Sequence, residues 1–191
     1  MSSPSVPGFR LLVGLGNPGR DYRDTRHNVG FLLLDRFAAR EGIEFHTEKS
    51  WQAEVARAGP LLLCKPLTYM NLSGQAVRPL TQFYRLDSSQ VLVVLDDMAL
   101  PLGRLRLRAT GSAGGHHGLQ SVIDHLGTPH VPRLRVGIGS AEQDAVDHVL
   151  GRFALEERPA LEQSLDRALE AIECARIRGL AAAMNAFNQT S

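Results

Sequence analysis

A polar loop after a short apolar run carries several side chains able to do chemistry. The run is 11–13, and the loop holds an amide, a phenol, an imidazole and a second amide, which are Asn17, Tyr22, His27 and Asn28. An imidazole exchanges protons near neutral pH, and amides both donate and accept hydrogen bonds. Loops at the carboxyl ends of strands are where open α/β sheets build their sites. The loop therefore predicts acid–base chemistry on a bound ligand.

A carboxylate suited to partner His27 ends a second apolar run. Asp96 follows residues 91–95 and is expected at the same sheet edge as the loop. A carboxylate that accepts a proton from one imidazole nitrogen fixes the tautomer and leaves the other nitrogen as a base. Asp97 is a rival. Adjacent strand residues point to opposite faces, so only one of the two is expected to reach His27.

The sequence offers no obvious nucleophile. It has no G-x-S-x-G elbow, and Cys64 lies in an apolar run typical of a packed thiol. We therefore expect His27 to activate water directly, and general-base assistance of this kind is worth about 10²- to 10⁴-fold in rate.

The same loop also satisfies G-x-G-x-x-G through Gly14, Gly16 and Gly19, which would suit a dinucleotide cofactor. Such a fingerprint opens directly into a packed helix, whereas here the next apolar helical face begins only at Val29. A structural turn is the further alternative.

A second strand–helix junction spans residues 65–74. Asn71 offers both a donor and an acceptor there, while Tyr69 and Met70 offer apolar surface to a base or a peptide side chain. Ser73 is positioned to cap the following helix.

A third junction, at 111–118, is rich in glycine and opens a helix. Its backbone amides are suited either to a phosphate or to a flexible turn, and the sequence leaves both open. The adjacent His116 and His117 make a poor zinc site because neighbouring side chains diverge and no matching ligand motif exists.

Arginines alternate with leucines in one predicted strand. Arg104, Arg106 and Arg108 share a face with a spacing of roughly 6.6 Å. Arg133 and Arg135 repeat the pattern. The pattern suits either a solvated face or a row of phosphate contacts.

The composition limits the class of protein. The chain has 191 residues, 43% hydrophobic and 21% charged, with a net charge of +1. It has no apolar run long enough to span a bilayer, and residues 1–8 resemble a flexible tail rather than a secretion signal. Only Cys64 and Cys174 are present, which suits a reducing cytoplasm.

Hydrophobic patterning predicts one α/β domain over residues 9–191, with a twisted mixed sheet flanked by helices on both faces. The expected strands cover 11–15, 43–45, 52–58, 61–65, 91–96, 104–108 and 133–138, with a hairpin at Gly59-Pro60. The expected helices cover 28–41, 75–85, 118–126, 145–150 and a C-terminal pair within 156–188, broken near Gly179.

Five segments in order give the chain a family resemblance. They are 14–28, 65–74, 96–103, 111–119 and 133–139, within a match that runs from about Arg10 to Phe187. Together they resemble bacterial-type peptidyl-tRNA hydrolase.

The resemblance implies cleavage of the ester between a peptide and the 3′ ribose of tRNA, recycling tRNA from abandoned chains without metal or cofactor. By position it implies His27 as catalytic base and Asp96 as its orienting acid. Asn17 would recognise the peptide and Asn71 would position the substrate. Residues implied to line the cleft or to grip tRNA phosphate are Tyr22, Tyr69, Met70, Arg108 and Arg135. We expect a cytoplasmic monomer whose partner is peptidyl-tRNA, with no membrane and no obligate protein partner.

Two positions depart from the family pattern. His117 stands where the family has an asparagine that contacts the substrate, and Ala99 replaces a commonly acidic residue. We expect activity to survive both. The rival hypotheses are an RNA-binding module that retained the cleft, which would not release peptide, and a nucleotide-cofactor oxidoreductase, which would bind its cofactor in a titration.

Overall fold

Seven strands form one mixed sheet in the computed structural model, which describes residues 8–141 and 144–188. Their order across the sheet is β2-β3-β4-β1-β5-β7-β6. The strands are β1 (Leu11–Gly14), β2 (His46–Glu48), β3 (Ala53–Ala58), β4 (Leu61–Pro66), β5 (Val91–Asp97), β6 (Leu105–Arg108) and β7 (Arg133–Gly137).

The four central strands β4, β1, β5 and β7 run parallel. Their apolar runs are almost wholly buried, as expected where helices cover both faces of a parallel sheet. The outer pairs β2–β3, β3–β4 and β6–β7 are antiparallel, so the predicted hairpin is confirmed. Gly59 turns that hairpin with a φ of 57°, a conformation that favours glycine.

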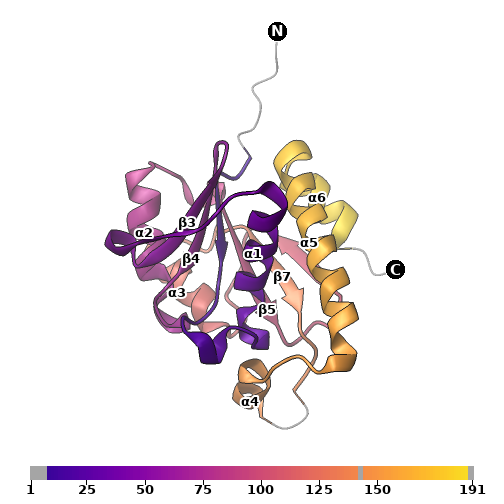
Figure 1. Cartoon of the computed structure of the whole chain (residues 1–191). Helices are drawn as coiled ribbons and strands as arrows, with labels where there is room; N and C mark the ends of the chain where they lie inside the picture. Colours follow the sequence, from indigo (N-terminus) through magenta and orange to yellow (C-terminus); the bar gives the residue numbers. More distant parts are fainter. Residues whose placement is uncertain (1–7, 142–143, 189–191) are drawn as a thin grey trace.

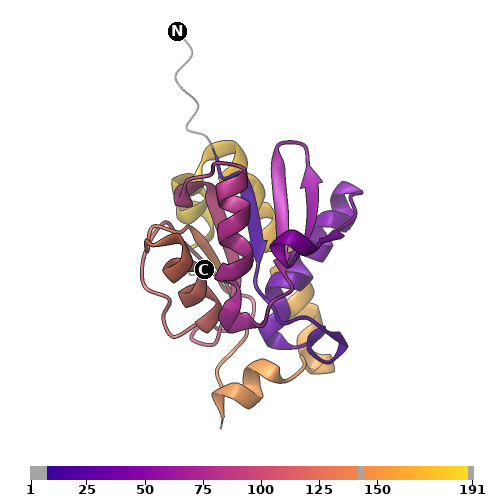
Figure 2. The same ribbon diagram turned by 90° about the vertical axis from the view of Figure 1, so that its left-hand side faces the viewer.

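Helices cover both faces, as predicted. On one face lie α1 (Val29–Glu41), α5 (Arg158–Arg178) and α6 (Leu180–Phe187); on the other lie α2 (Gly74–Phe83) and α3 (His117–Leu126). Figures 1 and 2 show the sheet between these layers, with α4 (Ala145–Leu150) beyond the carboxyl ends of the central strands. Each face has its own apolar core.

Glycine residues end helices α1 and α5. α1 stops at Gly42 and α5 at Gly179, and both residues have positive φ, 66° and 91°. The predicted break between the C-terminal helices is therefore confirmed. Short 3₁₀ turns shape the loops at the carboxyl edge: η1 (Arg20–Tyr22), η2 (Arg26–Asn28) and η4 (Met70–Leu72).

Two local predictions were wrong. The short strand expected at 43–45 is instead β2, because a tight turn sets its pairing so that Glu48 lies opposite Ala53. Ser73 does not cap α2: its hydroxyl donates to the Met70 carbonyl at 2.7 Å, and Ser121 Oγ accepts from the first amide of the helix, that of Gly74.

Within residues 8–141 and 144–188, no helix combines the length and apolar character needed to cross a membrane. The predicted N-terminal tail lies outside the described residues except for Gly8. Cys64 and Cys174 are both free thiols, and burial raises the pKa of Cys64 to about 12, which keeps it unreactive.

Candidate active site

Two glycines bring the start of α1 onto the sheet. A Cβ at Gly30 would lie only 2.6 Å from the Leu15 amide nitrogen and 2.7 Å from the Val94 carbonyl oxygen. Gly14 meets the backbone of Gly30 equally closely. Only residues without a side chain permit this approach. It places η2, the turn before α1, directly beside the end of β5.

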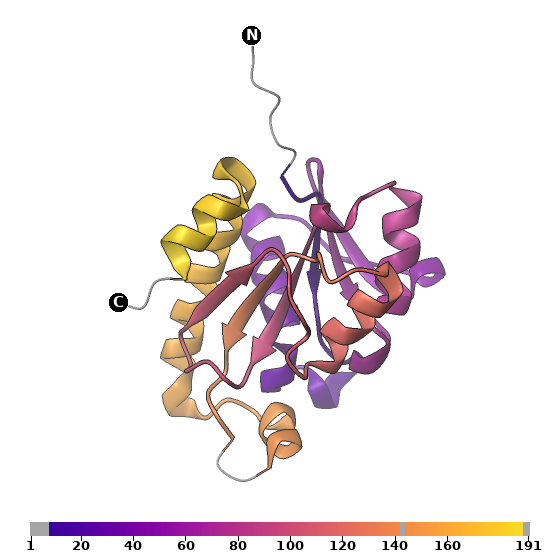
Figure 3. The same cartoon turned by 180° about the vertical axis from the view of Figure 1, so that it is seen from behind.

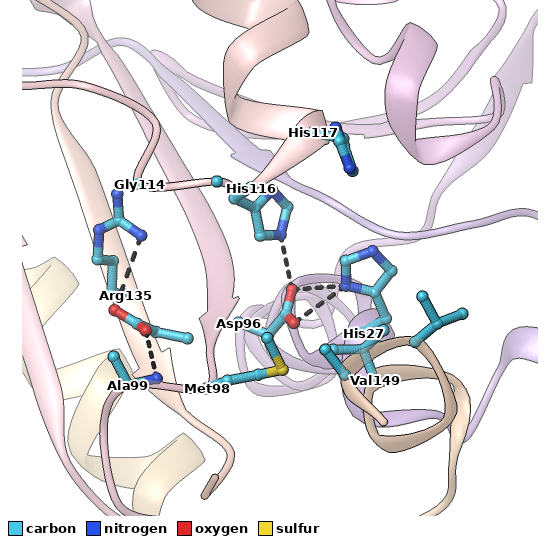
Figure 4. A pocket seen from close by; sticks show the side chains of 13 residues that line it. His27, Asp96, Met98, Ala99, Gly114, His116, His117, Arg135 and Val149 are labelled. Atoms are coloured by element: carbon cyan, nitrogen blue, oxygen red, sulfur yellow. Dashed lines mark hydrogen bonds and ion pairs between the residues drawn. The ribbon is translucent and has the colours of Figure 1, made fainter. Parts of the chain in front are cut away.

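His27 and Asp96 meet at this edge. His27 Nδ1 lies 2.9 Å from Asp96 Oδ1 and 3.0 Å from Oδ2 (Figure 4). Asp97 instead accepts from the Ala99 amide at 2.8 Å and faces Arg135 at 3.7 Å. As expected from strand alternation, only one of the two carboxylates reaches the imidazole. Since a carboxylate accepts, the contact puts the proton of His27 on Nδ1 and leaves Nε2 with a lone pair.

A second imidazole that the sequence reasoning missed shares this carboxylate. His116 Nε2 lies 2.8 Å from Asp96 Oδ1, and its Nδ1 accepts from the Leu119 amide at 3.2 Å, capping α3. The two histidine rings are 5.1 Å apart (Figure 4). A histidine at the N-cap of a helix at the same sheet edge as Asp96 was the available signal.

Opposing effects act on Asp96. Burial by itself would raise its pKa, but the charge of His116, the hydrogen bonds from His116 and His27, and the charge of His27 outweigh burial and lower the pKa to about 2. The carboxylate is therefore ionised at any pH near neutrality.

His27, Asp96 and His116 could also be considered as metal ligands, because their ligand atoms lie within 4.8 Å of one another. The hydrogen bond at the far side of His116 opposes this. A metal on Nε2 would require a proton on Nδ1, yet that nitrogen accepts from Leu119. The residues fit a hydrogen-bonded network better than a metal centre.

A cavity of about 310 Å³ opens beside the network (Figure 4). Its walls combine the imidazoles with glycine backbone, one guanidinium and apolar side chains from the β5–β6 loop and from α4. The lining residues are His27, Asp96, Asp97, Met98, Ala99, Gly114, Gly115, His116, His117, Arg135, Ala145, Val146 and Val149. Both positions that depart from the family pattern, Ala99 and His117, are among them.

Asn17 faces a different part of the edge. Its Oδ1 accepts from the Met70 amide at 2.7 Å, and its backbone exchanges two hydrogen bonds with the Asn28 side chain. It lines a second cavity, of about 450 Å³, together with Lys65. Lys65 is buried and pairs with Asp35 at 2.5 Å and with Glu54 at 2.8 Å.

Of the remaining predicted cleft residues, Met70 is joined to this second region through the hydrogen bond from its amide to Asn17. Met70 is buried against the start of α3, while Tyr69 is 60% exposed. Asn71 is exposed and Tyr22 half-buried. Tyr22, Tyr69, Met70 and Asn71 do not line the 310 Å³ cavity, and in the described part of the chain no hydrogen bond joins them to His27.

The arginines of β6 and β7 form a cluster on the sheet face that carries α2 and α3, over the part that these two helices leave open (Figure 3). Arg106 and Arg108 are exposed, as the alternation predicts. Arg135 is half-buried and donates to the Ala113 carbonyl at 3.1 Å. Burial first, then the charges of Arg135 and Arg108, lower the pKa of Arg133 to about 10. The cluster thus concentrates positive charge.

The prediction that Arg133 repeats the exposed pattern was wrong. Its side chain is buried and donates to four carbonyls, those of Val131, Ser112, Gly111 and Pro129. A buried guanidinium is satisfied by such acceptors. Arg133 therefore fixes the glycine-rich loop and is not available to a ligand.

The glycine fingerprint does not form a dinucleotide site. Gly19 leads into η1, and α1 begins only at Val29, so no helix N-terminus follows the glycines. A Cβ at Gly16 would lie 2.7 Å from the Phe31 ring. Gly14 and Gly16 serve close packing of α1 on the sheet.

Comparisons with known proteins agree with one another. The family described as "Peptidyl-tRNA hydrolase" matches residues 11–191. A peptidyl-tRNA hydrolase of Synechococcus sp. strain JA-2-3B'a(2-13) is 55% identical over 186 residues, covering 94% of this chain and 83% of the relative. That of Synechocystis sp. strain PCC 6803 is 51% identical, covering 94% and 95%.

The fold is also similar to a solved structure. The crystal structure of peptidyl-tRNA hydrolase from Acinetobacter baumannii superimposes with a TM-score of 0.91 at 32% sequence identity, covering 99% of each chain.

Proposed function

The chain belongs to the peptidyl-tRNA hydrolase family, and on that premise we propose that it cleaves the ester between peptide and tRNA with His27 as general base. The observation that carries the proposal is the 2.9 Å contact between His27 Nδ1 and Asp96 beside an open cavity. It leaves Nε2 able to take a proton from water. The hydroxide that results attacks the ester carbonyl, the bond to the 3′ oxygen of the ribose breaks, and the imidazolium returns its proton to that leaving oxygen.

Asp96 acts by orienting the imidazole and by stabilising the imidazolium that forms during attack. Its low pKa, about 2, keeps it an acceptor throughout. His116 holds the same carboxylate from the other side, so Asp96 has two fixed partners. We assign His116 to this supporting role.

The roles of the groups that contact the substrate are assigned from the family pattern. Asn71 and nearby backbone amides stabilise the oxyanion, an effect worth about 3–4 kcal/mol for each well-aimed donor. Asn17 holds the last peptide unit, Tyr22, Tyr69 and Met70 provide apolar surface beside it, and His117 contacts the substrate at the mouth of the first cavity. The hydrogen bond from the Met70 amide to Asn17 supports this grouping, because it fixes the orientation of the Asn17 amide.

The arginine cluster binds the phosphates of tRNA. Arg108 is exposed and Arg135 lies at the wall of the catalytic cavity, so a chain of phosphates leading to the ester could contact both. Arginine suits this task because its planar fork matches phosphate oxygens.

The test compares hydrolysis of N-acetylated aminoacyl-tRNA with that of unblocked aminoacyl-tRNA, for the native protein and for His27→Ala. We expect the native protein to cleave the blocked substrate and to spare the free one, and the variant to cleave neither. Binding of tRNA without release of the acyl group by the native protein would identify an RNA-binding module instead.

Two further properties belong to the proposal. We expect a monomer, which sedimentation would test, and a cytoplasmic location, with which two free thiols are compatible.

A further inference from the structure

One wall of the catalytic cavity has little packing of its own. α4 contributes Ala145, Val146 and Val149 to the lining, yet none of its six residues is buried. Val146 remains 61% exposed. Within α4 only Val149 packs, partly buried, against the apolar core, so packing holds this helix weakly, since most helical stability in proteins comes from tertiary packing. Other contacts must help to fix this wall.

Hydrogen bonds attach α4 and the segment after it to neighbouring parts of the chain. In the last turn of α4, His148 Nε2 lies 2.9 Å from the carbonyl oxygen of Gly139, a residue of the loop before the helix. At its C-terminal end the chain continues into residues 151–157, and this segment is bound by Arg26. Figure 1 shows α4 below the sheet, where η2 also lies.

Arg26 contacts residues 151–157 at several points. Its backbone amide donates to the Gly151 carbonyl at 2.9 Å, and Nη1 donates to the Arg152 carbonyl. Nη2 pairs with Glu157 at 2.6 Å, and the guanidinium lies 5.2 Å from the centre of the Phe153 ring. The Arg26 side chain is only 12% exposed, whereas that of Glu157 is 30% exposed.

Arg26 is also the residue next to His27. Within η2, Arg26 reaches the segment after α4, His27 reaches Asp96, and the Asn28 side chain binds the Asn17 backbone. Because Arg26 and His27 are joined by one peptide bond, the contacts of Arg26 couple the position of the α4 wall to that of the imidazole. No other residue of η2 contacts residues 151–157 among the described hydrogen bonds.

We infer that Arg26 is a positioning residue, which fixes the α4 wall of the cavity relative to His27. The inference rests on the proposed function, because the cavity matters only if the ester is cleaved there. Arg26 is not a phosphate ligand, since its terminal nitrogens are already bound to a carbonyl and a carboxylate. It contacts no reacting atom and acts through the segment that it holds.

The test uses Arg26→Gln, Arg26→Lys and Glu157→Gln. The matched control is Arg36→Gln, because Arg36 on α1 also pairs with the C-terminal region, through Glu162 and Asp166, but within the described residues makes no hydrogen bond to residues 151–157. The measurements are kcat, KM and the pH profile with N-acetylated aminoacyl-tRNA, thermal melting, and hydrogen exchange of the α4 amides.

For Arg26→Gln we expect kcat to fall about 10- to 100-fold, as misplacement of a site wall by about 1 Å can do. KM should change by less than about threefold, because phosphate contacts dominate tRNA affinity. The shape of the pH profile should stay native, since His27 and Asp96 are untouched. The α4 amides should exchange faster, Lys should restore part of kcat, and Glu157→Gln should show a weaker form of the same change.

Two results would overturn the inference. One is a kcat within about twofold of native while the α4 amides exchange faster, which would mean that this wall does not need fixing. The other is equal loss of kcat in Arg26→Gln and Arg36→Gln together with equal loss of thermal stability, which would mean a general structural role. If Arg26→Gln does not fold, Glu157→Gln decides the same question. An inactive native protein would instead refute the proposed function, and unchanged α4 exchange in the variants would still overturn the anchoring role.

Discussion

Two buried charged groups lie at the carboxyl edge of the sheet, one on β5 and one on β4, and each is shared by two side-chain partners. Asp96 accepts from two imidazoles. Lys65 pairs with two carboxylates, Asp35 and Glu54, and its ammonium lies 4.1 Å from the centre of the Phe45 ring. The geometry is similar, with a carboxylate at the centre of one cluster and an ammonium at the centre of the other.

The two clusters differ in whether a proton acceptor remains available. The carboxylates around Lys65 are 54% and 34% exposed, both pair with its ammonium, and the cluster contains no imidazole to act as a base. The cluster around Asp96 includes His27, whose Nε2 makes no hydrogen bond within the described residues and belongs to a cavity-lining ring. The Asp96 cluster is reactive because an imidazole lone pair is available beside the cavity, and the Lys65 cluster is static because it has none.

The largest expected effect tests that lone pair. His27→Ala should lower kcat at least about 10³-fold, since it removes the base and the imidazolium that Asp96 stabilises. Circular dichroism and thermal melting should show an intact fold. The control is His46→Ala, an exposed histidine on β2. Turnover near the native value would show that the Asp96 cluster is as static as the Lys65 cluster.

Asp96→Asn should have the next largest effect, a fall in kcat of about 10²- to 10³-fold, because an amide can present its N–H to the imidazole and reverse the tautomer. A pH–rate profile is the measurement. A variant with an unchanged profile and unchanged kcat would contradict the orienting role, and Asp97→Asn provides the neighbouring comparison.

The same carboxylate should make stability depend on pH. Its pKa is about 2 in the folded protein against about 3.9 in an unfolded chain, so the folded state gains roughly 2–3 kcal/mol above about pH 4. That gain is lost as the pH falls through about 2. Urea unfolding of the native protein and Asp96→Asn should show a difference that shrinks from pH 6 to pH 3. A constant difference would mean that Asp96 is not held in its charged form by the imidazoles.

Arg108 belongs to neither cluster, and its proposed contribution is to bind tRNA phosphate at the protein surface. Arg108→Ala should raise KM about three- to tenfold and reduce the slope of log affinity against log salt by about 1, as expected when one phosphate contact is lost. The control is Arg40→Ala, an exposed arginine near the end of α1. An unchanged salt slope would refute the phosphate contact. A change in kcat alone would indicate that Arg108 acts in catalysis instead of in tRNA binding.

The smallest effect on turnover is expected from the static cluster. Lys65→Met should leave kcat within about threefold of native while lowering the free energy of unfolding by about 1–3 kcal/mol, because two carboxylates lose their partner. Chemical denaturation measures the loss, and Lys49→Met at an exposed lysine is the control. A large fall in kcat without loss of stability would break the contrast and assign Lys65 to the substrate.

Apolar runs made most of the fold predictable. Residues 91–95 and 61–64 are buried on both faces of the sheet, and such runs mark parallel strands whatever their neighbours are. The displacement of β2 was not predictable in this way, because its register depends on pairing with β3 and its own exposed side chains give no alternation.

The site was predictable where a residue type had one plausible partner. Asp96 was expected near His27 because Asp96 and the loop that carries His27 both follow apolar strands ending at one sheet edge, and alternation implied that only one of Asp96 and Asp97 would reach the imidazole. His116 and Arg133 were misjudged because their partners are set by the fold: a carboxylate 20 residues away for His116, and carbonyls of the glycine-rich loop for Arg133. Spacing along the chain does not report such contacts.

The turn η2 has a consequence for how the protein can change. A 3₁₀ turn has three residues per revolution, so its consecutive side chains point in directions about 120° apart. Arg26, His27 and Asn28 use these three directions for three different parts of the molecule. Inserting or deleting one residue before Val29 would rotate every side chain onto its neighbour's target. Variation within this stretch can therefore exchange residue types but cannot alter the length of the segment.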